Sequence, residues 1–362
     1  ISVKELVAAT AKHNMNAVAL TDHANMMGAF HFVKEVKAHN RLINEINTKN
    51  KEEGKDVSGH KIKPIVGCEF FVCEDHTNKS LKDYGYQMVL LAKNKNGYQN
   101  LVKMASIAYT DGFYYVPRID KSVIEQYKED IIVLSGNLYG EISSKILNIG
   151  EKQAEEAVIW WQRQFGDDFY LEMMQHNQED ERRVNQTLKV FSQKFQVKLI
   201  TTNNNYYCEK QDANAHDILL CVKDGEKQST PIGRGRGFRH GLPNHEYYYK
   251  SSDEMKSLFR DYPESIINIQ EVIDKIEIYS LYRDVLLPKF EIPSEFEDPN
   301  DLKDAGKRGE NNYLRHLTFE GAKKRYVELT AELTERIDFE LKTIEKTGYP
   351  GYFLIVEDFI RE

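Results

Sequence analysis

The stretch Ala17-Val18-Ala19-Leu20-Thr21-Asp22-His23 is typical of a short apolar strand that ends in polar side chains. Five similar runs follow it, at residues 63–72, 87–92, 131–135, 169–173 and 198–202. Segments with helical spacing of apolar residues lie between these runs, at residues 2–13, 28–49, 98–109, 150–165 and 179–195. Alternating strands and helices predict parallel strands joined by helical crossovers, hence an α/β fold. These strands, with one or more expected upstream, favour a barrel over an open sheet.

The chain changes character after the last predicted strand. Helical patterns cover residues 252–260 and 263–276, and residues 287–304 are rich in Pro, Glu and Asp, as an extended linker is. Strongly helical segments follow at residues 310–329 and 331–347, and the turn Gly348-Tyr349-Pro350-Gly351 begins another helix. We therefore expect two domains, an α/β domain at residues 1–280 and a linker with a mostly helical segment at residues 281–362.

Composition narrows the class of protein. Hydrophobic residues make up 41% of the 362 residues, which is enough for a large core and excludes general disorder. No uncharged apolar run approaches the length of about 18 residues that spans a bilayer, so we expect no membrane segment. Four cysteines without a CxxC pair indicate reduced thiols and a cytoplasmic location. Because the chain opens without Met in an amphipathic run and closes in a helical pattern, we expect a fragment of a longer protein.

Polar side chains stand where the predicted strands end, which is where α/β barrels carry their chemistry. Asp22 and His23 follow the first strand and Glu69 lies in the second. These side chains are of the kind that holds Zn²⁺ or Mn²⁺ for hydrolysis. A single Asp-His pair, however, more often caps a helix or satisfies a loop. The other strand ends carry amides and a phenol, which are poor zinc ligands.

A glycine-rich run, Gly233-Arg234-Gly235-Arg236-Gly237, follows the barrel-like part and lacks the Gly-Lys-Ser/Thr ending of a phosphate-binding loop. With Arg239 nearby, Arg234 and Arg236 predict contact with a DNA phosphate backbone. The alternative is a solvated surface loop without a ligand.

Several ordered motifs together carry a family resemblance. They are residues 17–25, 65–70, 90–94, 112–120, 165–172, 215–221 and 348–356. In this order they resemble the PHP (polymerase and histidinol phosphatase) domain of bacterial replicative DNA polymerase III α subunits, followed by the start of the palm region. The resemblance implies a distorted seven-stranded (β/α) barrel and then a mostly helical segment that leads into the palm. In active members the barrel binds a cluster of divalent metals and trims DNA 3′ ends.

The resemblance also assigns metal-site positions, at which this sequence keeps some ligands and lacks others. Asp22, His23 and Glu69 match ligand positions of the family. Four positions depart from the pattern: Gln87 for a histidine, Asn137 for a cysteine or histidine, and Asn204 and Tyr206 for an Asp-x-His pair. The family's first motif, His-x-His, is expected upstream of residue 1. We therefore expect a structural barrel that binds Zn²⁺ or Mn²⁺ weakly or not at all. The alternatives are a one-metal site, a metal-dependent 3′–5′ exonuclease, or a phosphoesterase.

For the parent protein, the resemblance implies a DNA-directed DNA polymerase that uses Mg²⁺ in a palm beyond these residues. No catalytic residue is therefore expected within this chain. The implied partners are primer-template DNA, dNTPs, and replisome subunits such as a proofreading subunit and a sliding clamp. A free-standing barrel hydrolase is disfavoured, because such an enzyme needs no long helical extension after residue 287.

Overall fold

The computed structural model describes all residues of the chain except 58, 234, 284–287, 305 and 362. These residues form two compact units, Ile1–Leu281 and Tyr282–Glu362, which are described separately. Among the helices of the described residues, none has both the length and the apolar character needed to cross a membrane.

One mixed sheet organises the first unit. Its strands are β1 (Ala17–His23), β2 (Lys63–Cys73), β3 (Tyr86–Ala92), β4 (Arg118–Asp120), β5 (Ile131–Leu134), β6 (Phe169–Met173) and β7 (Lys198–Thr201). They are arranged in the order β1-β2-β3-β5-β6-β7, and β4 pairs with β2. The sheet curls into a half-barrel, in which the described residues do not pair β7 with β1. The predicted α/β class is confirmed.

The direction of β3 differs from the expectation of parallel strands throughout. β3 pairs antiparallel with both β2 and β5, whereas the β1–β2, β5–β6 and β6–β7 pairs are parallel. The described chain has no helix between β2 and β3. It therefore turns back after β2, and β3 pairs antiparallel with β2 without a helical crossover. β4 has three residues, too few to show an alternating pattern in the sequence.

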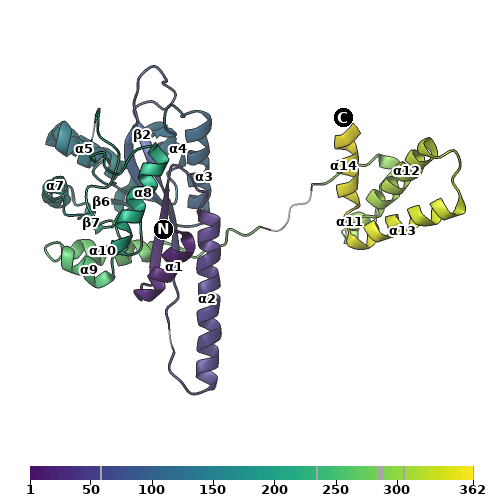
Figure 1. The fold of residues 1–362 in the computed structure, drawn as a ribbon, viewed down its shortest axis with the longest axis horizontal. Helices are drawn as coiled ribbons and strands as arrows, with labels where there is room; N and C mark the ends of the chain where they lie inside the picture. The colour runs from purple at the N-terminus through teal and green to yellow at the C-terminus, as the bar shows by residue number, and fades with distance from the viewer. Residues whose placement is uncertain (58, 234, 284–287, 305, 362) are drawn as a thin grey trace. The chain divides into compact units, whose positions relative to one another are not determined.

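Helices surround this sheet. They are α1 (Val3–Lys12), α2 (Ala29–Glu52), α3 (Lys95–Thr110), α4 (Lys121–Tyr127), α5 (Glu141–Asn148), α6 (Glu151–Phe165), α7 (Glu179–Phe195), α8 (Ala213–Asp224), α9 (Ser252–Leu258) and α10 (Pro263–Lys275). α1, α2, α3, α6, α7, α9 and α10 match segments predicted from periodicity, whereas α4, α5 and α8 were not predicted. α2 reaches well beyond the sheet, as Figure 1 shows. The chain returns along α2, where the Asn40 side chain exchanges two hydrogen bonds of 2.8 Å with the backbone of Ile62.

The two faces of the sheet form separate cores. Phe70, Leu90 and Leu171 face the covering helices in the larger core. Ile65, Leu91, Tyr170 and Ile200 line the inner, concave side, where Val272 and Ile276 of the α10 region pack against them. Apolar side chains thereby fill much of the interior near α10, where the Tyr170 hydroxyl donates to Glu271 over 2.7 Å.

The second unit is helical. It contains a short 3-10 helix at Ser294–Phe296, then α11 (Asp301–Asp304), α12 (Arg308–Arg325), α13 (Ala331–Thr347) and α14 (Pro350–Arg361). Gly348 ends α13 at a φ of 75°, a conformation that glycine adopts without strain. Arg315 of α12 joins α13 through an ion pair with Asp338, with 2.6 Å between Nη1 and Oδ1. The predicted helical segment is thus present.

Candidate functional site: the mouth of the sheet

Polar side chains, among them His23, Glu69, Gln87 and Glu172, lie on the inner face of the sheet at one end of the strands. We call this end the mouth. Cross-strand partners share a face, and the register pairs His23 with Glu69. The same face carries Gln87 and Glu172, because side chains alternate along each strand. β3 runs antiparallel, so its beginning, not its end, brings Gln87 to this edge.

His23 and Glu69 form the one close pair of predicted ligands. His23 Nδ1 lies 2.8 Å from Glu69 Oε1, and the Glu69 side chain is nearly buried while His23 is half exposed. The adjacent carboxylate raises the pKa of His23, against the opposing effect of burial. The two side chains can therefore share a proton or jointly bind one cation.

Asp22 does not join this pair. It precedes His23 in β1 and so points to the opposite face of the sheet. Its Oδ2 accepts a 3.1 Å hydrogen bond from the backbone N–H of Gly28, directly before α2. A Cβ at Gly28 would come within 2.5 Å of that oxygen, so the glycine permits the close approach. In this structure Asp22 fixes the start of α2.

The four neutral residues at predicted ligand positions bond to one another in pairs. Asn137 donates from Nδ2 to Gln87 Oε1 over 2.9 Å. Asn204 donates from Nδ2 to the Tyr206 hydroxyl oxygen over 3.3 Å. Burial raises the pKa of Tyr206, so its hydroxyl stays protonated at neutral pH. These side chains form two separate neutral hydrogen-bonded pairs at the mouth.

Glu172 is a mouth residue that the sequence analysis did not select as a ligand or catalytic group. Its side chain is buried in β6, where Oε2 accepts a hydrogen bond from Gly136 N–H over 2.9 Å and Oε1 accepts one from Thr202 Oγ1 over 2.5 Å. Burial raises its pKa to about 7. An acid within an otherwise apolar strand, Phe169-Tyr170-Leu171-Glu172-Met173, was the signal that could have identified it.

This set of donors does not fit a cluster of divalent cations. Both oxygens of Glu172 are occupied, the amides are neutral, and Asp22 faces away. His23 and Glu69 alone cannot neutralise two or three divalent ions that repel each other.

A second group of possible ligands lies beyond the mouth. Asp75, His76 and Asp120 are the one set of three or more His, Cys, Asp or Glu residues among the described residues whose ligand atoms lie within 4.8 Å of one another. Asp120 accepts hydrogen bonds from His76 Nδ1 over 2.5 Å and, through Oδ1, from the first N–H groups of α4. Buried Arg118 donates to the carbonyls of His76 and Asn78. Asp120 therefore caps α4 and orients His76, while backbone carbonyls accept the hydrogen bonds of the Arg118 guanidinium.

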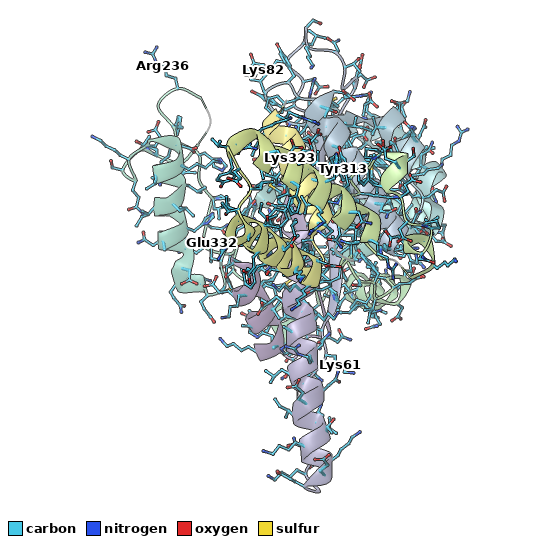
Figure 2. All side chains as sticks on the ribbon, turned by 90° about the vertical axis from the view of Figure 1, so that its right-hand side faces the viewer. Lys61, Lys82, Arg236, Tyr313, Lys323 and Glu332 are labelled. Carbon is cyan, nitrogen blue, oxygen red and sulfur yellow. The ribbon has the colours of Figure 1, made fainter. Side chains whose placement is uncertain are left out.

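The three arginines predicted to contact DNA have different environments. Arg239 is 5% exposed, and its Nη1 and Nη2 bind the two Asp217 oxygens at 2.6 and 2.9 Å. Its guanidinium therefore holds the loop to α8 and is not free for a phosphate. Arg236 is exposed and extends from the loop tip (Figure 2). Arg234 lies outside the described residues.

Comparison with protein families places this sheet in a known class. Residues 1–176 match the PHP domain family. Residues 312–362 match the bacterial DNA polymerase III alpha NTPase domain. The first unit therefore carries a PHP domain.

Full-length relatives give the particular family. The DNA polymerase III α subunit of Borreliella burgdorferi is 37% identical over 366 residues, covering 99% of this chain and 28% of the relative. Those of Treponema pallidum and Campylobacter jejuni are 34% and 30% identical, covering 99% of this chain and 28% and 29% of the relatives. The chain is similar over nearly its whole length to bacterial DNA polymerase III α subunits, as the resemblance implied, and spans less than a third of these relatives' length.

Proposed function

We propose that this chain is part of a replicative DNA-directed DNA polymerase and that its PHP domain is a scaffold rather than a nuclease. One observation supports the scaffold role above all others. The Gln87–Asn137 and Asn204–Tyr206 pairs are satisfied by each other without a cation. Four positions at which the resemblance expects metal ligands are thus engaged in hydrogen bonds between neutral side chains, which supply no negative charge for a metal cluster.

The polymerase role rests on the family. It implies primer-template DNA and dNTPs as substrates, Mg²⁺ as the cofactor of a palm, a cytoplasmic location, and contacts with a proofreading subunit and a sliding clamp. We assign residues 1–280 to the PHP domain and residues 281–362 to the linker and the helical start of the palm. The exposed Arg236 is the remaining described candidate for contact with the DNA backbone.

A metal-dependent 3′–5′ exonuclease or phosphoesterase is the competing function. The contact between His23 and Glu69 favours it, because this pair could hold a single cation. One cation held by two protein ligands would remain largely hydrated and exchange readily. We therefore place the exonuclease second.

Metal analysis of the full-length protein tests the two functions. The scaffold predicts well under one equivalent of Zn²⁺ or Mn²⁺ after purification and no metal-dependent loss of 3′-terminal nucleotides. A restored variant, Gln87→His/Asn137→His/Asn204→Asp/Tyr206→His, serves as the matched control and is expected to retain more metal. Stoichiometric metal in the unmodified protein, with 3′ trimming that a chelator abolishes, would favour the exonuclease.

A further inference from the structure

A cavity of about 150 Å³ lies beside α8 in the first unit. The residues at the mouth do not line it. Its wall comes from Tyr207, from one side of α8, and from the described parts of the loop that precedes α9. It is open to solvent on one side, so a small molecule or an unstacked group can enter.

The Tyr207 hydroxyl indicates that the cavity is built for a polar ligand. Tyr207 is 5% exposed, and its buried oxygen has no partner with good hydrogen-bond geometry among the described residues. Burial raises the pKa of the Tyr207 hydroxyl, although the Tyr247 backbone lies close enough to lower it in part. A buried phenol usually finds a partner, because an unpaired hydroxyl forfeits its hydrogen bonds to water. A ligand in the cavity would supply the missing partner.

The charge of the wall favours a neutral ligand. Asp217 is the carboxylate among the described lining residues, and the Arg239 guanidinium neutralises it through two hydrogen bonds. Burial lowers the pKa of His216, so its imidazole is neutral at pH 7 and can both donate and accept. Neither a bare cation nor a phosphate would find a compensating charge here.

The size and lining of the cavity favour a single planar ring. Leu220, Ile232 and Leu242 supply aliphatic walls, and Asn214 and Gln228 supply amides. Gln228 Nε2 donates to Asn214 Oδ1 over 2.8 Å, which orients the Asn214 amide nitrogen as a further donor. A cavity of about 150 Å³ is known to accept a benzene-sized ring. Amide side chains suit the edge of a nucleobase, which presents adjacent donors and acceptors.

We propose that this cavity binds an unpaired pyrimidine base of the DNA substrate. The proposal rests on the proposed function, which makes DNA the substrate of the protein. The base edge forms hydrogen bonds with the Tyr207 hydroxyl and the His216 imidazole, and the ring lies between the aliphatic side chains. A strand end or unpaired nucleotide can occupy the cavity without loss of base pairing, because its base is already free of the duplex.

Titration of this chain with thymidine tests the proposal, by calorimetry or ligand-observed NMR. We expect saturable binding with a dissociation constant on the order of 1 mM, since a nucleoside has few atoms to contribute. Tyr207→Phe should weaken binding about 3- to 10-fold, because it removes one neutral hydrogen bond. Tyr279→Phe is the matched control, since the Tyr279 hydroxyl is also buried and unpartnered in the described residues but does not line the cavity. This control should bind thymidine as the unmodified chain does.

Ile232→Trp provides a second variant, which fills the cavity from its partly exposed loop and should abolish binding even if Tyr207→Phe fails to fold. Absence of saturable thymidine binding would overturn the proposal. So would equal binding of 2-deoxyribose 5-phosphate, which carries no base, or an unchanged affinity in both cavity variants. Primer extension by the full-length protein is measured separately, so a failure of the polymerase function is distinguishable from a failure of this site.

Discussion

Glu172 couples the stability of the first unit to pH. Its pKa rises from 4.5 to about 7 on folding, because burial penalises the carboxylate. Between these two values the unfolded chain releases a proton that the folded chain retains, so this residue's contribution to stability falls as pH rises and is constant above pH 7. Glu172→Gln keeps an acceptor for Gly136 and removes the charge. We expect it to stabilise the fold by roughly 3 kcal/mol at pH 8 and little at pH 4.5.

Urea unfolding followed by tryptophan fluorescence measures this effect. Trp160 and Trp161, the two tryptophans of the chain, both lie in α6 of the first unit and report on it alone. The difference between variant and unmodified chain at each pH isolates Glu172 from the other titrating groups. An equal difference at both pH values would show that Glu172 remains ionised in the folded chain.

The mouth shows which residues sequence alone can place. Strand ends were visible as apolar runs followed by polar side chains, and this pattern brought His23, Glu69 and Gln87 to the same edge. The pattern could not show that Asp22, and not His23, faces away from the mouth. Which of two successive side chains points inward depends on how β1 is aligned with the neighbouring strand. The acid of Glu172 within an apolar strand was a visible signal, but its two hydrogen bonds could not be inferred, because they come from segments distant in sequence.

At the scale of elements, α10 closes the apolar end of the sheet. Ile276 follows directly after α10 and is 2% exposed against the inner core, and Lys63 of β2 donates from Nζ to the carbonyls of Ile273 and Ile276. Ile276→Ala removes buried methyl groups and should lower the free energy of unfolding by about 2–5 kcal/mol. Ile278 is the matched control, because it is the same residue type and 74% exposed.

Ile278→Ala should change the unfolding free energy by less than about 0.5 kcal/mol in the same urea titration. Equal effects of the two substitutions would mean that α10 does not seal the core. The helix itself was predictable from its apolar spacing, and Pro263 at its start reinforces that prediction. The packing of α10 against the inner side of the sheet was not predictable, because an amphipathic pattern shows which face of a helix is buried but not which element packs against it. The reversal of β3 was hidden for a similar reason, since a buried strand looks alike in either direction.

At the scale of the whole molecule, we expect this chain alone not to extend a primer. Template-directed nucleotide addition by two metal ions requires carboxylates that hold both ions about 4 Å apart. In the described residues the one set of close ligands is Asp75, His76 and Asp120, of which Asp120 already caps α4 and bonds to His76. Incubation with primer-template, dNTPs and Mg²⁺ should therefore leave the primer unextended, while the full-length protein elongates it under the same conditions. A different result would be nucleotide incorporation by this chain that Asp120→Asn abolishes and Asp75→Asn does not. That result would place polymerase chemistry at Asp120 and contradict the assignment of catalysis to a palm outside this chain.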